Sequence, residues 1–396
     1  MQIIDTTREL AIPPLFRLGF RPFFLGGALF ALVAVPLWLL AWNGHFAAWQ
    51  PAGGWLAWHR HEMLFGFGAA IVAGFLLTAV QNWTERPGLR GAPLAALATL
   101  WLAARIAWLA DAPAALLVPL QLAFLPLVAL VMARMLFAVR QARNYPVVVV
   151  LLLMTLADAL NMAGVVQGDV ALQQRGAMTG IWVIVTLLGL IGGRVIPFFT
   201  MRGLGLKKGP VALPWMDWVV LVGGMAMVLL TAAGIARDPH AAIAVFCFQL
   251  AAGHLLRLCK WYEPGIWRVP LLWSLHLAYA WLVVATFGFG LWHAGFVANL
   301  SLPLHALTIG AMSGAILAMI ARVSLGHTGR ELLPPRAMTP AFVLLNLGML
   351  ARTLLVIAWP QTGLVLAAIC WTLAFAIFSR HYAPMLWSAR VDGRPG

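Results

Sequence analysis

The stretch WHRHEMLFGFGAAIVAGFLLTAVQN, residues 58–82, places two histidines and a carboxylate at the start of a long apolar run. A helix of about 20 apolar residues crosses the roughly 30 Å of hydrocarbon in a bilayer. The run that follows Glu62 has this length and contains no charged residue. We therefore expect residues 60–82 to span a membrane, with His59, His61 and Glu62 at the entrance of the span.

The composition of the whole chain is that of a membrane protein. Of its 396 residues, 63% are hydrophobic and 10% are charged, which is far outside the range of soluble domains. A net charge of +14 would suggest nucleic-acid binding in a soluble protein. Here the basic residues stand in short gaps between apolar runs, as membrane insertion requires. We expect lipid, and no nucleic acid, as a partner.

Segments of spanning length recur along the chain and predict an all-α fold of about twelve transmembrane helices. We treat residues 1–396 as a single transmembrane domain. The predicted spans are residues 22–42, 60–82, 91–109, 114–138, 146–166, 176–199, 215–235, 240–258, 270–291, 301–321, 338–358 and 362–380.

Lys and Arg indicate the orientation of these spans. Most of them lie in the N-terminal segment, in the even-numbered connections and after the last span. Loops on the cytoplasmic side of membrane proteins carry the excess of positive charge. The sequence therefore predicts that both termini are cytoplasmic.

Short motifs recur at corresponding places in different spans. A Thr-x-Arg motif follows the second, sixth and tenth spans, at residues 84–86, 200–202 and 328–330, and His61 and His305 each precede a glycine by five residues. This pattern predicts three parallel four-helix repeats, a plan similar in architecture alone to haem-copper oxidase subunit I. The predicted repeats cover about residues 16–140, 141–260 and 261–385.

Ionisable side chains inside spans are costly and are therefore candidates for function. By the predicted topology, six of them share the periplasmic third of the membrane: His59, His61, Glu62, Arg105, His305 and Arg352. On one helix, His59 and His61 would point about 160° apart, so each would face a different pocket. Neutral imidazole binds haem iron, copper or zinc. We predict His59, His61 and His305 as metal ligands; the alternative is that they are interfacial residues with solvated tips.

Further basic residues could bind a cofactor. Arg105 and Arg352 suit haem propionates, which favour bidentate cationic partners; alternatively they extend to the membrane surface. His254 and His276 lie toward the cytoplasmic side on consecutive spans, and they could hold a haem or form a proton path, or else bond to backbone carbonyls or to each other. His327 lies in a polar turn that is either an anion or propionate site or the membrane edge.

Two carboxylates are candidates for proton transfer. Glu62 follows His61 directly, where it could orient a ligand, carry protons or pair with Arg60. Asp158 lies near the middle of the fifth span. It could relay protons or form a hydrogen bond to Asn161 or to a neighbouring helix. We predict Glu62 and Asp158 as the catalytic groups.

Four motifs, in order along the chain, resemble those of the NnrS family: LGFRPFF at residues 18–24, WHRHEMLFGF at 58–67, HALT at 305–308 and RVSLGHTGR at 322–330. The resemblance covers nearly the whole chain. It implies a twelve-span protein of the bacterial inner membrane that contains haem and copper and is linked to nitric oxide metabolism and nitrosative stress. The three cysteines show no CxxCH spacing, so a haem would be bound non-covalently, as haem b.

Depth and spacing predict a His-ligated metal site in the periplasmic half of the membrane, and the resemblance implies that this site binds or turns over nitric oxide with electrons from an unidentified donor. In its catalytic form the protein would be a nitric oxide-consuming oxidoreductase. Two alternatives stand beside it. One is a twelve-span transporter or a protein that delivers copper or haem; the other is a redox sensor or assembly factor without turnover. The sequence does not indicate an oligomeric state.

Overall fold

The structure is a computed structural model that describes residues 6–211 and 213–395. These residues form helices and no strands, and twelve helical segments are long and apolar enough to cross a membrane. The prediction of an all-α protein with twelve spans is thus confirmed. The segments are Phe20–Trp42, Trp55–Thr84, Ala92–Leu109, Ala114–Ala138, Ala142–Gln167, Val170–Gly203, Pro214–Ala232, Ala241–Trp261, Pro270–His293, Ser301–His327, Met338–Ala358 and Pro360–Trp387.

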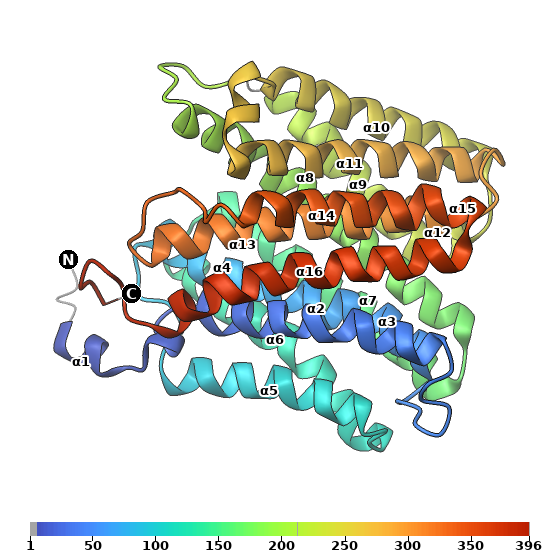
Figure 1. Cartoon of the computed structure of the whole chain (residues 1–396), viewed down its shortest axis with the longest axis horizontal. Coiled ribbons are helices and arrows are strands. Elements are labelled where there is room, and N and C mark those ends of the chain that lie inside the picture. Colours follow the sequence, from blue (N-terminus) through green and yellow to red (C-terminus); the bar gives the residue numbers. More distant parts are fainter. Residues whose placement is uncertain (1–5, 212, 396) are drawn as a thin grey trace. The chain divides into compact units, whose positions relative to one another are not determined.

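Several segments combine more than one helical element (Figure 1). In chain order the elements are α1 (Thr6–Ala11), η1 (Pro14–Phe16), α2 (Phe20–Trp42), α3 (Trp55–His61), η2 (Glu62–Gly68), α4 (Ala69–Thr84), α5 (Ala92–Leu109), α6 (Ala114–Ala138), η3 (Ala142–Asn144), α7 (Tyr145–Gln167), α8 (Val170–Gly203), α9 (Pro214–Ala232), η4 (Ile235–Arg237), α10 (Ala241–Trp261), η5 (Pro264–Arg268), α11 (Pro270–His293), α12 (Ser301–His305), η6 (Ala306–Ser313), α13 (Gly314–His327), α14 (Met338–Leu350), η7 (Ala351–Leu355), α15 (Val356–Ala358) and α16 (Pro360–Trp387).

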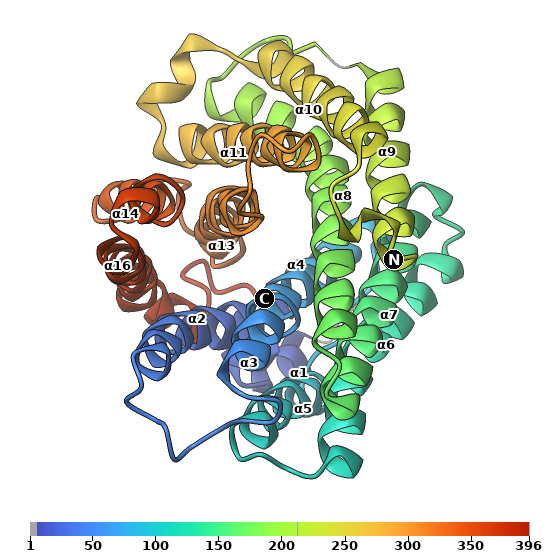
Figure 2. The ribbon, with the colours of Figure 1, turned by 90° about the vertical axis from the view of Figure 1, so that its right-hand side faces the viewer.

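The chain divides into two compact units. The first comprises Met1–Ala177, Ile320–Pro335 and Phe375–Gly396, and the second comprises Met178–Met319 and Arg336–Ala374. In the first unit, α4 packs against α2 and α6, and α6 packs against α5 and α7 (Figure 2). In the second, α11 packs against α10 and η6. These units do not follow the boundaries of the three predicted repeats, and the repeat remains a prediction.

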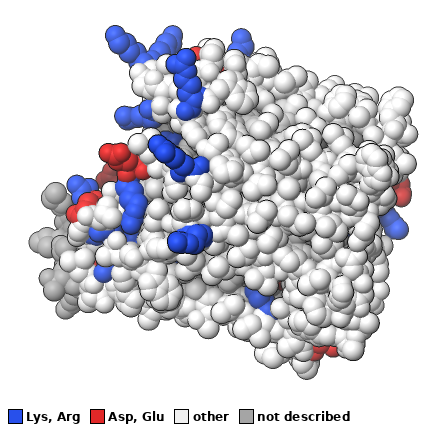
Figure 3. Space-filling model, in the orientation of Figure 1, with Lys and Arg blue, Asp and Glu red and all other residues white. Residues whose placement is uncertain are grey.

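The outer surface of the helices is apolar. Large side chains such as Leu156, Trp218 and Leu229 are more than 60% exposed, and wide areas of the surface in Figure 3 carry neither basic nor acidic side chains. Such a surface would promote association in water. It is the surface expected of helices whose solvent is lipid.

Three segments widen into π-helix: η2, η6 and η7. Two of them begin directly after His61 and His305, and the third contains Arg352. A π-helical turn frees backbone carbonyls from the regular ladder and is frequent at functional sites. The two histidines that the sequence pairs therefore share a local helix geometry.

The close approach of α7 and α8 depends on glycine. A Cβ atom added at Gly176 would overlap the backbone nitrogen of Asn161 and lie 2.8 Å from the carbonyl oxygen of Ala157. Backbone atoms of a packed helix cannot move separately to make room. We expect Gly176→Ala to lower the free energy of unfolding by about 1–3 kcal/mol, measured by thermal unfolding in detergent.

A control for this substitution is Gly253→Ala on α10. A Cβ atom there would lie 3.4 Å from the sulfur of Met216, which is an ordinary contact with a flexible side chain. This variant should unfold close to the wild-type midpoint. Equal midpoints for both variants would mean that the α7–α8 contact does not require glycine.

Candidate functional site

The entrance of the second span is shaped by the junction of α3 and η2. His61 ends α3 and Glu62 begins η2. Glycine four residues later makes room for the carboxylate, because a Cβ atom at Gly66 would lie 2.6 Å from Glu62 Oε2. The carbonyls of Phe65 and Gly66 turn outward and accept hydrogen bonds from Arg105 Nη1, at 3.5 Å, and Trp101 Nε1, at 3.0 Å. The π-helical turn thus holds α5 against the site.

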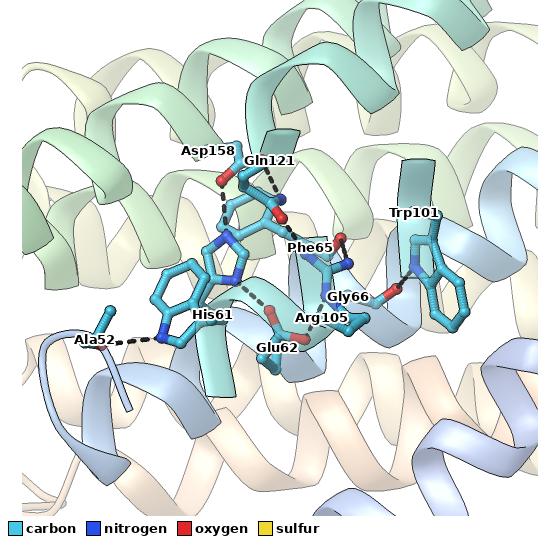
Figure 4. Close-up of polar contacts among 10 residues, drawn as sticks. Ala52, His61, Glu62, Phe65, Gly66, Trp101, Arg105, Gln121 and Asp158 are labelled. Carbon is cyan, nitrogen blue, oxygen red and sulfur yellow. Dashed lines mark hydrogen bonds and ion pairs between the residues drawn. The ribbon is translucent and has the colours of Figure 1, made fainter. Parts of the chain in front are cut away.

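His61 lies between two carboxylates (Figure 4). Its Nδ1 is 2.9 Å from Glu62 Oε1, and its Nε2 is 2.8 Å from Asp158 Oδ1 on α7. The three side chains are at most 1% exposed. The indole of Trp108 packs over the imidazole at 4.1 Å between ring centroids. The imidazole is therefore fixed in place by polar bonds at both nitrogens and by an aromatic wall.

Two further side chains close these contacts into a cycle. Arg105 Nε lies 2.6 Å from Glu62 Oε2, and Arg105 Nη2 donates to Gln121 Oε1 on α6. Gln121 Nε2 in turn donates to Asp158 Oδ2 at 2.8 Å. We call His61, Glu62, Arg105, Gln121 and Asp158 the polar cycle. All its members are 3% exposed or less.

The hydrogen bonds of the polar cycle fix its number of protons. A carboxylate oxygen and a deprotonated ring nitrogen both only accept, so each of the two His61 contacts needs one proton. With one proton on each contact, His61 is positively charged. The positive charges of His61 and Arg105 then balance the negative charges of Glu62 and Asp158. Losing one proton would leave an uncompensated charge in a buried site, which is unfavourable. We infer that the cycle carries one proton more than a neutral histidine with two ionised carboxylates.

The sequence singled out four members of the polar cycle, and the structure brings them together. The sequence analysis missed Gln121. A signal was present, because an amide inside an otherwise apolar run needs a partner in the membrane. Of the alternatives for Asp158, the structure shows bonds to neighbouring helices, through His61 and Gln121. Asn161 is not its partner, since the Asn161 amide donates to the Gln173 carbonyl at 2.8 Å.

The other predicted metal ligands have different surroundings. His59 stacks on Trp38 at 4.2 Å between ring centroids. In the second unit, His305 Nδ1 lies 2.7 Å from the carbonyl oxygen of Ser301. Arg352 Nη2 donates to the Ser301 hydroxyl at 2.9 Å. Ser301 thus links two residues that the sequence named separately, His305 and Arg352.

His254 and His276 differ in the contacts that their ring nitrogens make. His276 Nδ1 and Nε2 lie 3.0 Å and 3.4 Å from the carbonyl oxygens of Leu272 and Trp261. This is the backbone bonding that the sequence left as an alternative. His254 Nδ1 lies 2.8 Å from the Tyr279 hydroxyl. Its Nε2 is buried and has no hydrogen-bond partner among the described residues.

The hydrogen-bond partner of His254, Tyr279, belongs both to a polar cluster and to the lining of an apolar cavity. Arg257 Nη1 donates to the Tyr279 hydroxyl at 2.9 Å, and Arg257 Nη2 pairs with Asp217 at 2.9 Å. Tyr279 also lines an apolar cavity of about 60 Å³, together with Gly192 and other residues of the second unit. A water molecule occupies about 30 Å³ in the liquid. The cavity therefore has room for a diatomic gas.

His327 lies in the first unit near Phe20, at 5.5 Å between ring centroids. Its backbone carbonyl accepts from Arg390 at 3.1 Å. Within residues 6–211 and 213–395, no group of three or more His, Cys, Asp or Glu side chains is arranged to hold a metal ion. The polar cycle is a buried hydrogen-bonded network of ionisable side chains, and the Nε2 atom of His254 is a buried ring nitrogen without a hydrogen-bond partner among the described residues.

Comparison with known proteins agrees with the motifs of the sequence. No curated protein matches the chain. The family model described as NnrS protein matches residues 14–390, which is nearly the whole chain. This polytopic membrane protein therefore belongs to the NnrS family.

Proposed function

We propose that this protein is a haem- and copper-containing protein of the bacterial inner membrane, with both termini in the cytoplasm, that serves nitric oxide metabolism or nitrosative-stress defence. Membership of the NnrS family supports this proposal, together with the resemblance of its motifs. In the catalytic form, the protein consumes nitric oxide as an oxidoreductase. The metal site predicted from the sequence would lie in the periplasmic half of the membrane, which nitric oxide reaches through lipid, whereas a haem held by His254 would lie toward the cytoplasmic side.

The observation that carries the proposal is the polar cycle. Reduction of two nitric oxide molecules to nitrous oxide and water consumes two protons and two electrons. Such a reaction needs protons delivered within the membrane, and the buried hydrogen-bonded network of His61 with Glu62 and Asp158 supports this role. Groups positioned for proton transfer contribute about 10²–10⁴-fold to a rate.

The predicted ligands fit a cofactor unequally. His254 fits haem iron, because its buried Nε2 is unused among the described residues and an imidazole nitrogen is a good ligand. His61 fits less well, since both its nitrogens are bonded to carboxylates. His61 can bind a metal ion only if one carboxylate moves away. Haem or copper, when bound, supplies the site for nitric oxide and the change of redox state.

Residues around His254 orient its imidazole and keep water away from it. Arg257 donates to the Tyr279 hydroxyl, and this hydroxyl fixes the imidazole through Nδ1. The apolar cavity beside Tyr279 admits a small uncharged gas and disfavours water, because its lining offers few hydrogen-bond partners. Arg352 and Arg105 stay candidates for carboxylate groups of a haem. Arg105, however, is engaged with Glu62 and Gln121.

We expect His254→Ala to lower the haem content of the purified protein at least tenfold, because a buried axial ligand is lost. The measurement is the pyridine haemochrome assay on protein from haem-supplied cells. His276→Ala is the matched control, since both ring nitrogens of His276 face backbone carbonyl oxygens, at 3.0 Å and 3.4 Å. Equal haem content in His254→Ala and wild type would remove His254 from the ligand set.

The proposal as a whole is tested by optical spectra of the purified protein, oxidised and reduced, with and without nitric oxide, alongside metal analysis of the same sample. Haem bands, copper and a spectral shift with nitric oxide are the expected result. Nitric oxide consumption with an artificial electron donor would establish turnover. Bound cofactors without consumption would instead indicate a sensor or assembly factor.

A transporter is the second candidate function, and the polar cycle also favours it. Buried ionisable side chains in spans mark proton relays of transporters as well as of redox proteins. In that case the histidines would pass copper or haem transiently. A colourless, metal-free protein from cells supplied with haem and copper would support this alternative.

A further inference from the structure

A second unusual polar group lies at the first turn of α2. Arg21 is fully buried, with 0% of its surface exposed. Its Nη1 donates to the backbone carbonyls of Leu386 at 3.0 Å and Ser388 at 2.6 Å. Its Nε and Nη2 have no hydrogen-bond partner among the described residues. Unused donors on a buried charge are unfavourable, so they indicate an acceptor that this part of the chain does not supply.

Other arginines surround Arg21. The charges of Arg17, Arg390 and Arg330 act on it unfavourably. We call these four residues the arginine cluster. Its one carboxylate partner among the described ion pairs is Asp392, which lies 2.6 Å from Arg390 Nη2. The hydrogen bond from Arg390 holds the pKa of Asp392 well below its usual range, so this carboxylate is charged at neutral pH. The arginine cluster still keeps an excess of positive charge.

The free edge of Arg21 has the shape of an oxyanion site. Nε and Nη2 lie on the same side of the planar guanidinium group, and their N–H bonds are nearly parallel. This edge binds two oxygens of one phosphate or carboxylate group. The backbone carbonyls of Leu386 and Ser388 use Nη1 instead. Such carbonyls satisfy donors without neutralising charge, so the requirement for an anion remains.

The position of Arg21 favours a particular anion. Arg21 is the second residue of the spanning segment Phe20–Trp42, so it stands where a helix leaves the hydrocarbon. Phospholipid phosphate groups occupy this level, and basic pockets between membrane helices bind anionic headgroups. We propose that the arginine cluster binds the phosphate group of an anionic phospholipid, gripped by the Nε and Nη2 edge of Arg21. Arg17, Arg330 and Arg390 supply further positive charge.

The chain after α16 forms the cover of this site. Arg17 Nη1 donates to the Pro395 carbonyl at 3.2 Å, and Val391 N donates to the Thr328 carbonyl at 3.2 Å. Val391 and Asp392 are exposed. Residues 388–395 belong to no helix. If they move to admit a phosphate group to the fully buried Arg21, hydrogen bonds break but no helix unfolds.

The test is a thermal-shift titration of the full chain in detergent with phosphatidylglycerol. Phosphatidylcholine is the zwitterionic comparison, and inorganic phosphate against chloride at equal ionic strength tests the free anion. We expect phosphatidylglycerol to raise the midpoint and phosphatidylcholine to leave it unchanged. Arg21→Gln should weaken the apparent affinity for phosphatidylglycerol about tenfold or more, because a bidentate charge-assisted contact is lost.

Two other variants complete the design. Arg21→Lys keeps the charge but lacks the two-pronged edge, so it should also bind more weakly, and it decides the question if Arg21→Gln fails to fold. Arg86→Gln is the matched control, because Arg86 is an exposed arginine after α4. It should bind as the wild type does.

The outcomes are distinct. A higher unfolding midpoint with phosphatidylglycerol alone identifies a lipid headgroup as the ligand. A higher midpoint with inorganic phosphate as well shows that the free anion suffices. Either result supports the site if the Arg21 variants bind more weakly. No shift with either probe would overturn the proposal. So would equal affinities in wild type, Arg21→Lys and Arg86→Gln. None of these readings depends on haem or copper.

Discussion

Arg105→Leu should destabilise the protein by about 3–5 kcal/mol, the usual loss when one partner of a buried ion pair is removed. Arg105 is 3% exposed and is the guanidinium partner of Glu62, whose side chain is fully buried. Without it, two carboxylates face one protonated imidazole. The measurement is the midpoint of thermal unfolding in detergent, supported by unfolding in SDS.

A wild-type unfolding midpoint for Arg105→Leu would contradict the ion pair that the structure shows.

A double variant distinguishes the effect of the unpaired Glu62 charge on stability from the effect of lost Arg105 packing. Glu62→Leu with Arg105→Leu removes both partners, leaving His61 with Asp158 alone. Replacing a whole buried ion pair by apolar side chains is often neutral or stabilising. We therefore expect the double variant to regain much of the stability lost in Arg105→Leu. A double variant no more stable than the single one would assign the loss to packing.

Under the proposed function, Asp158→Asn should lower nitric oxide consumption about a hundredfold while leaving haem and copper content unchanged, since proton-transfer groups contribute about 10²–10⁴-fold. The variant removes one negative charge, so His61 no longer needs its second proton. The remaining Glu62 and Arg105 still balance each other. The fold should therefore tolerate this change better than Arg105→Leu.

The readouts for Asp158→Asn are the rate of nitric oxide loss with an electron donor and the metal content of the same sample. Asp111→Asn is the control, because Asp111 is an exposed carboxylate in a loop with φ 49°, a conformation that asparagine tolerates. A parallel loss of rate and metal would make Asp158 a residue that supports cofactor binding. An unchanged rate would exclude proton transfer through it.

The span count and the identity of most site residues could be predicted from the sequence for a simple reason. Apolar length is a local property, and a charge inside such a run is visible wherever it occurs. His61, Glu62, Arg105 and Asp158 stood out in this way. Gln121 did not, because an uncharged amide is a weaker signal in an apolar helix.

What these residues do for each other depends on packing. The sequence could not show that α5, α6 and α7 bring Arg105, Gln121 and Asp158 to His61, because their contacts join residues 16 to 97 positions apart. Nor could it show that both His61 nitrogens are engaged, whereas one nitrogen of His254 is not. Hydropathy indicates which helices lie in the membrane. The partner of each polar atom is decided only when the helices pack, because a buried donor or acceptor must find its partner across neighbouring helices.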